Sequence, residues 1–126
     1  MLPRVLLVED DEVIREIFAL KFEMEEVPIA TAPNGAAALQ LLPEFQPDII
    51  LLDMMMPVMG GLEFMQNLAS TGTSFPTVIV FSNISASHHT QDVLNLGASD
   101  YWVKSDFTPE QLVHEVCRRW QEMHTL

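Results

Sequence analysis

The chain contains little that could cross-link it covalently or anchor it in a bilayer. Its 126 residues include one cysteine, Cys117, so an internal disulfide is excluded. The longest apolar runs are far too short to span a bilayer. The amino terminus passes directly into a strand-like run, so we expect no signal peptide. These absences predict a single domain, residues 1–126, in the reducing cytoplasm and away from membranes.

Basic residues are scarce. Six Lys and Arg stand against 18 acids, and the formal net charge of −12 at pH 7 repels phosphate backbones. We therefore expect no direct nucleic-acid binding by this domain. Between Lys21 and Arg118 the only Lys or Arg is Lys104, which follows the strand-like segment Tyr101-Trp102-Val103. A solvated surface lysine is the ordinary interpretation, but its place at a strand end makes Lys104 a candidate site residue.

The sequence does have a regular alternation of strand-like and helix-like segments. Strands are predicted at Val5–Val8, Val27–Thr31, Asp48–Asp53, Thr77–Phe81 and Tyr101–Val103. Helices are predicted from Asp11 to about Met24, from Asn34 to near Pro43, after Gly60-Gly61, from about Ser85 to Leu96, and from Thr108 onwards. This order predicts an α/β fold, a doubly wound, five-stranded parallel sheet with five helices on both faces. Cys117 lies on the apolar stripe of the last helix and is expected to fill the core.

Charged and polar groups follow four of these strands, and parallel topology brings them to one edge of the sheet. They are Glu9-Asp10-Asp11-Glu12, Asp53, Ser82-Asn83 and Lys104. At about 4 Å, each pair of carboxylates costs about 4 kcal/mol at an effective dielectric of about 20. A divalent cation relieves that cost, and ligands that are all oxygen favour Mg²⁺. Helix initiation accounts for Asp11 and Glu12, but it does not account for the other charges.

The chemistry follows from this inventory. The sequence suggests no Ser-His-Asp or Cys-His arrangement, no Walker phosphate loop and no dinucleotide fingerprint. What remains is a carboxylate nucleophile, Asp53, with a Mg²⁺ site, the cation of Lys104 and the hydroxyl of Ser82. That set suits phosphoryl transfer onto an aspartate. The methionines of Met54-Met55-Met56 are expected to pack beneath the site.

The chain resembles the receiver domain of bacterial two-component response regulators, of the chemotaxis-regulator type, over residues 4–124. The matching segments are Val5-Leu6-Leu7-Val8-Glu9-Asp10-Asp11, Asp53-Met54-Met55-Met56-Pro57-Val58-Met59-Gly60-Gly61, Ser82 after the fourth strand, and Gly97-Ala98-Ser99-Asp100-Tyr101-Trp102-Val103-Lys104. The resemblance implies a flavodoxin-like strand order, 2-1-3-4-5. It implies a signalling switch that receives phosphoryl from a histidine kinase or histidine phosphotransfer protein and acts on a downstream effector.

The resemblance also implies residue roles. Asp53 is the phospho-acceptor, and Glu9, Asp10, Asp53 and the backbone carbonyl of Met55 hold Mg²⁺. Lys104 pairs with the phosphoryl group and Ser82 bonds it. Tyr101 is the switch aromatic, which turns inward as Ser82 moves. The surface of the fourth helix, fifth strand and fifth helix then changes its partners. Formation of a homodimer through this surface is left undecided by the sequence.

The chain departs from the family pattern at several positions. Ser105 follows Lys104 where the family generally has proline, and Asn83 stands at a position that is usually small. Met55 and Ile84 are apolar where family members tune dephosphorylation, which predicts a long-lived phosphoaspartate. Two alternatives stay open at this point. One is a pseudo-receiver, a binding module independent of phosphorylation. The other is a Mg²⁺-dependent aspartyl-phosphate phosphatase, which Met55 disfavours because such enzymes carry an aspartate there.

Overall fold

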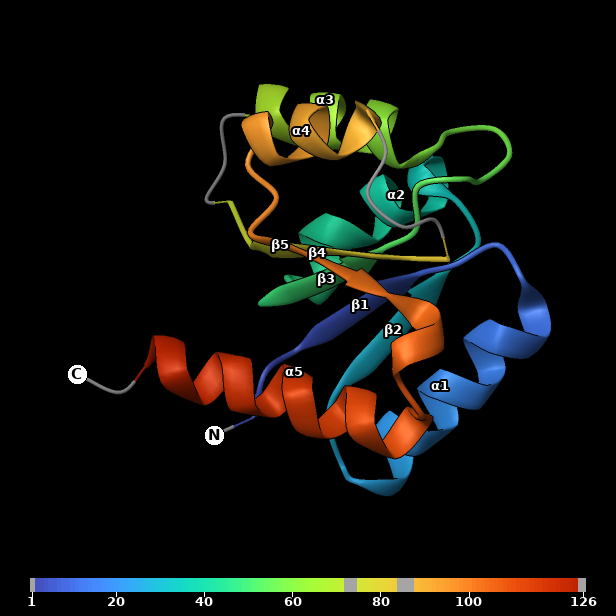
Figure 1. The fold of residues 1–126 in the computed structure, drawn as a ribbon, viewed down its shortest axis with the longest axis vertical. Coiled ribbons are helices and arrows are strands. Elements are labelled where there is room, and N and C mark those ends of the chain that lie inside the picture. The colour runs from blue at the N-terminus through green and yellow to red at the C-terminus, as the bar shows by residue number, and fades with distance from the viewer. Residues whose placement is uncertain (1, 72–74, 84–87, 125–126) are drawn as a thin grey trace.

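The computed structural model describes residues 2–71, 75–83 and 88–124 (Figure 1). Its strands are β1 (Val5–Val8), β2 (Ile29–Ala32), β3 (Ile49–Leu52), β4 (Thr77–Ser82) and β5 (Asp100–Val103). Its helices are α1 (Glu12–Met24), α2 (Gly35–Phe45), α3 (Gly61–Ser70), α4 (His88–Asn95) and α5 (Pro109–Met123), and a short 3₁₀ turn, η1 (Lys104–Asp106), follows β5. None of the helices in this part of the chain is long and apolar enough to cross a bilayer.

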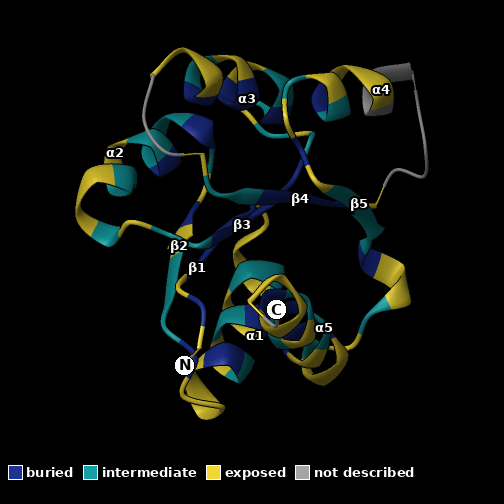
Figure 2. Cartoon of the chain, turned by 90° about the vertical axis from the view of Figure 1, so that its left-hand side faces the viewer, coloured by how far each residue is buried: buried dark blue, intermediate teal, exposed yellow. Residues whose placement is uncertain are grey.

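The strands form one parallel sheet in the order β2-β1-β3-β4-β5, which confirms the predicted order. Helices α1 and α5 cover one face, and α2, α3 and α4 cover the other (Figures 1 and 2). The central strands β1 and β3 are buried throughout, because both of their faces are covered. They pair in register from Val5 with Ile49 to Val8 with Leu52, so their carboxyl ends lie side by side.

Successive strand residues point to opposite faces, and this alternation builds two hydrophobic cores. The core beneath α1 and α5, called the first core, contains Val5, Leu7 and Phe18 among its buried residues. The second core, beneath α2, α3 and α4, contains Leu6 and Val8. Cys117 is half-buried and packs against the first core, which agrees with its predicted role as filler.

Capping groups begin several helices where the sequence predicts them. The Oδ1 atom of Asp11 accepts a hydrogen bond from the Ile14 N–H at 3.0 Å, which begins α1. Thr108 and Gln111 form the predicted capping box of α5. These local signals placed both helices correctly.

Two predicted boundaries are wrong by about two residues. Helix α2 runs past Pro43 to Phe45, because a proline in the last turn removes one hydrogen bond without ending the helix. The second strand begins at Ile29 rather than Val27, because the Val27 N–H donates to Phe22 O at 2.9 Å and prolongs the helical turn. Ile84 and the predicted helix start at Ser85 lie outside the described residues.

Candidate functional site

Asp53 follows β3 directly, and backbone hydrogen bonds fix both its main chain and its carboxylate. The Asp53 N–H donates to Val8 O at 3.1 Å and continues the pairing of β3 with β1. The Oδ1 atom accepts a hydrogen bond from the Met54 N–H at 2.8 Å. The residue is only 6% exposed. A single carboxylate is therefore held in one orientation at the end of a buried strand, as the sequence predicts.

Strand β1 brings two further carboxylates to the same edge. Glu9 is 1% exposed, and its N–H donates to Ala32 O at 2.9 Å. Its Oε2 atom accepts a hydrogen bond from the Asp11 N–H at 3.1 Å, whereas Asp10 is exposed. Carboxylate oxygens of Glu9, Asp10 and Asp53 all lie within 4.8 Å of one another. The structure thus brings together the three acids that the sequence nominates as metal ligands.

Lys104 is the cation of this cluster. It follows β5, whose last residue pairs with Ser82 of β4, and it is only 8% exposed. Its Nζ atom lies 3.0 Å from Asp53 Oδ2 and forms an ion pair with Glu9 Oε1. The prediction that Lys104 reaches the site from a strand end is confirmed, and the interpretation as a solvated surface lysine is wrong.

Burial and ion pairing shift the protonation equilibria of this cluster. Burial raises the pKa of the Glu9 carboxyl, and its bonds to Lys104 and to the Asp11 N–H oppose that shift only in part. Burial by itself would lower the pKa of Lys104. Its bond to Glu9 and the charge of Asp53 outweigh burial, so the pKa of the ammonium is raised. Lys104 therefore stays charged, since it faces two carboxylates in a buried setting.

The donor set fits Mg²⁺. Three clustered carboxylates face one ammonium, so negative charge is in excess, and every donor is oxygen. Asp10 lies on the exposed side, which leaves room for water or a phosphoryl oxygen. The expected packing of all three methionines beneath the site is wrong for Met55, whose side chain is 67% exposed. Met54 and Met56 do pack against the second core.

The two predicted switch residues lie on neighbouring strands. Ser82 ends β4 and is 1% exposed, next to the exposed Asn83. Tyr101 pairs with Val80, is half-buried and packs against the second core. Ser105 lies in the turn η1. The bond between Lys104 and Ser105 is trans, and no cis peptide bond occurs within the described ranges 2–71, 75–83 and 88–124. The catalytic and switch roles of Ser82 and Tyr101 stay predictions.

Two site residues escaped the sequence reasoning. Arg15 Nη1 donates to Glu9 O at 2.8 Å and to Asp10 O at 3.5 Å, and so holds the acidic segment against α1. The available signal was a cation near a helix amino terminus, where the dipole disfavours it. A Cβ atom on Gly61 would lie 2.6 Å from Asp53 O, so glycine is required for the close approach of α3 to the site. From the sequence, Gly61 marked a helix start and ended a segment that matches the family, but it was given no role of its own.

Comparisons with known proteins agree with this geometry. A family model described as the response regulator receiver domain matches residues 5–117. The chain is 38% identical over 102 residues to a protein-glutamate methylesterase/protein-glutamine glutaminase of Nocardioides sp., across 78% of this chain and 28% of that protein. It is 34% identical over 110 residues to response regulator MprA of Mycobacterium sp. (strain KMS), across 87% of this chain and 47% of that protein. The chain thus spans less than half the length of these relatives.

Solved structures give the same result. The receiver domain of Francisella response regulator 1452 is 27% identical with a TM-score of 0.81, over 96% of this chain and 98% of that one. The chemotaxis response regulator CheY4 of Vibrio cholerae is 27% identical with a TM-score of 0.81, over 94% and 98% of the two chains. The BeF3-activated DrrB receiver domain is 26% identical with a TM-score of 0.77, over 97% and 99%.

Proposed function

The chain belongs to the response regulator receiver domain family, phospho-accepting regulatory domains of two-component signalling, and from that premise we propose that Asp53 is its phospho-acceptor. One observation carries the proposal. The buried Asp53 carboxylate lies 3.0 Å from Lys104 Nζ and within a cluster that includes Glu9 and Asp10. This arrangement supports the proposal, because a fixed carboxylate lies beside the positive charge that phosphoryl transfer requires.

The proposed reaction transfers phosphoryl from a phosphohistidine of a histidine kinase or histidine phosphotransfer protein. A carboxylate oxygen of Asp53 forms a bond to phosphorus as the P–N bond breaks and the imidazole leaves. Glu9, Asp10, Asp53 and the Met55 carbonyl would hold Mg²⁺, which would supply positive charge to the phosphoryl oxygens. Lys104 then pairs with one phosphoryl oxygen, and the Ser82 hydroxyl donates to another.

The output of the proposed switch is a change of surface. Movement of Ser82 towards the phosphoryl group frees space beside the strand, and Tyr101 turns into it. Because Tyr101 already packs against the second core, its rotation alters how α4 and β5 meet. The surface of α4, β5 and α5 then binds a different effector partner. That partner is a second copy of the domain or another protein.

Helix α1 offers the phosphodonor a docking surface. Val13, Ile17, Leu20 and Met24 are 65%, 50%, 56% and 65% exposed and lie along one side of the helix. This apolar stripe begins three residues after Asp10, at the edge from which a donor must reach Asp53. Apolar side chains this exposed point to a protein partner. We therefore assign the α1 stripe to contact with the donor.

The ion cluster also helps to distinguish the proposed switch from the two alternatives, a pseudo-receiver and a phosphatase. A pseudo-receiver has no need of a buried nucleophile, a lysine and an acidic pair held together, so their assembly supports the switch. Sustained phosphatase turnover needs an acid or base near Met55, whose exposed side chain is apolar. The same feature supports a slow loss of phosphate from Asp53.

We further propose that residues 1–126 act as one cytoplasmic receiver domain that does not itself bind nucleic acid.

Intact mass spectrometry tests the proposal. The protein is incubated with Mg²⁺ and acetyl phosphate, and we expect a single phosphoryl adduct that requires the metal and decays slowly after the donor is removed. Asp53→Ala abolishes the adduct. Asp11→Asn is the matched control, because it removes a neighbouring acid while asparagine still caps α1. Absence of the adduct, from this donor and from a cognate kinase, contradicts the proposal. Continuous release of phosphate supports the phosphatase.

A further inference from the structure

The free edge of β2 has unused backbone hydrogen-bonding groups. Strand β2 ends the sheet on one side and pairs only with β1 among the described strands. The Val5 N–H donates to Pro28 O and the Glu9 N–H donates to Ala32 O, each at 2.9 Å. In a parallel ladder alternate residues bond to the same neighbour. The amide and carbonyl groups of Ile29 and Thr31 therefore point away from β1 and towards solvent.

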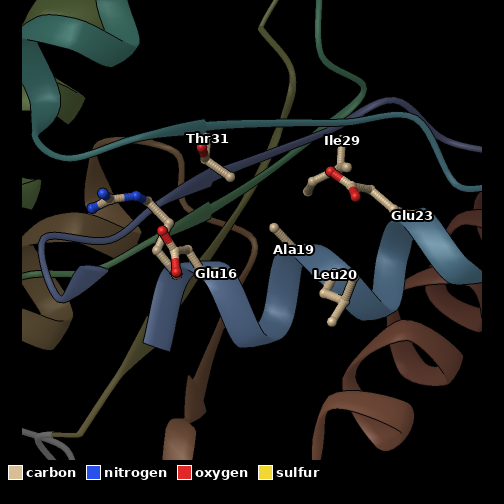
Figure 3. Close-up of a pocket in the computed structure, with 7 residues that line it drawn as sticks. Glu16, Ala19, Leu20, Glu23, Ile29 and Thr31 are labelled. Carbon is tan, nitrogen blue, oxygen red and sulfur yellow. The ribbon is translucent and has the colours of Figure 1, made fainter. Parts of the chain in front are cut away.

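A groove lies along this edge, between β2 and α1 (Figure 3). It measures about 490 Å³, and its lining includes Ala19 and Leu20 from α1 and Ile29 and Thr31 from β2. Figure 3 shows Glu16 and Glu23 on either side of Ala19 along the helix. The small side chain of Ala19 leaves space between helix and strand for side chains from another chain.

Charge indicates what this groove accepts. Neither Glu16 nor Glu23 has an ion-pair partner within the part of the chain that the structure describes. Arg15 also lines the groove, but its guanidinium is bonded to Glu9 O and Asp10 O. The groove thus pairs apolar contacts with two free negative charges. A second copy is disfavoured as occupant, because its own carboxylates would meet these across the shared edge.

We propose that an extended, lysine- or arginine-containing segment of a partner protein adds to β2 as a further strand. Its backbone bonds to the outward groups of Ile29 and Thr31, which supplies affinity. Its basic side chains lie on the face of the added strand that covers the groove, where their charged ends reach Glu16 and Glu23 and their aliphatic stems contact Ile29. This surface shares Leu20 with the α1 stripe, but it is centred on the edge of β2 and does not depend on phosphorylation of Asp53.

Fluorescence polarisation with designed peptides tests the proposal. The probe is a capped, fluorescein-labelled hexapeptide of alternating lysine and valine, and the matched probe has glutamate in place of lysine. We expect saturable binding of the first probe and none of the second. Glu16→Gln with Glu23→Gln weakens binding by roughly tenfold, since two exposed ion pairs are lost. Glu44→Gln with Glu63→Gln removes the same charge from α2 and α3 and leaves binding unchanged.

Backbone pairing is tested separately from charge. Two versions of the lysine probe carry N-methyl groups on one or the other set of alternate amides. We expect methylation of the amides that face β2 to abolish binding, and methylation of the opposite amides to preserve it. Hydrogen exchange of the Ile29 and Thr31 amides slows when the unmodified probe binds. Equal binding of both methylated probes, unchanged exchange of these amides, or equal weakening by the two double substitutions overturns the proposal.

Discussion

The charge of Asp53 is expected to destabilise the metal-free protein, so that Asp53→Asn raises its stability. Asparagine keeps the shape of the side chain and can still accept the hydrogen bond from Met54 N–H at 2.8 Å. What it removes is one negative charge from a buried cluster of three carboxylates and one ammonium. The sign of the effect depends on whether Lys104 compensates for that charge.

The magnitudes can be compared directly. At an effective dielectric of about 20, the attraction between Asp53 Oδ2 and Lys104 Nζ at 3.0 Å is about 5.5 kcal/mol. An ionised Glu9 has a carboxylate oxygen within 4.8 Å, so its repulsion is at least about 3.5 kcal/mol, and the exposed, better screened Asp10 adds about 1 kcal/mol. The net attraction is therefore at most about 1 kcal/mol, which is smaller than the desolvation cost of a buried carboxylate, several kcal/mol. We expect Asp53→Asn to stabilise the metal-free protein by about 1–2 kcal/mol.

Thermal unfolding in EDTA and in Mg²⁺ measures the effect. For a domain of this size, Tm in EDTA is expected to rise by about 3–10 °C. Mg²⁺ is expected to raise the Tm of the unaltered protein through binding to the folded state, and to raise that of Asp53→Asn much less. Asp11→Asn is the control and leaves both values nearly unchanged. A lower Tm of Asp53→Asn in EDTA would refute the reasoning, because Lys104 would then outweigh repulsion and desolvation together.

Further predictions concern the cation, a glycine, a helix cap and the thiol. Lys104→Met leaves two buried carboxylates without their cation, and urea unfolding in EDTA is expected to show a loss of about 3–5 kcal/mol that Mg²⁺ partly restores. Gly61→Ala forces a Cβ atom against Asp53 O and is expected to cost about 1–3 kcal/mol and to slow phosphorylation; an unchanged rate and Tm contradict this. Thr108→Ala removes the cap of α5 and costs about 1 kcal/mol, whereas Thr108→Ser keeps it. Burial raises the pKa of Cys117, so its alkylation by iodoacetamide at pH 8 is expected to be slower in the folded protein than in urea and to accelerate only at higher pH.

Local patterns in the sequence predicted the fold well. The apolar runs of β1 and β3 identify strands that are buried on both faces. The strand order was expected from the resemblance to the family, and the structure confirms it. Thr108-Pro109 marks the start of α5 to the residue. Errors arose where local signals compete, as at Pro43, which the last turn of α2 tolerates. They also arose at Val27, whose N–H joins the end of α1 instead of the sheet.

The site was predictable in its members but not in its geometry. Glu9, Asp53 and Lys104 could be grouped in advance, because parallel strands end at a common edge. Their burial could not be deduced, since exposure depends on the helices and loops that cover that edge. Arg15 was missed because its partners are backbone carbonyls, which leave no trace in the sequence.

By itself, the sequence determined which chemical groups this protein possesses and at which strand ends they lie, because periodicity and capping are local properties of the chain. Only the tertiary structure decided that Lys104 forms ion pairs with both Glu9 and Asp53, and that Met55 faces solvent. It alone shows that β2 presents the Ile29 and Thr31 backbone beside Glu16 and Glu23, two glutamates with no ion-pair partner among the described residues. The physical reason is distance: charge, burial and edge pairing depend on residues brought together from far apart in the chain.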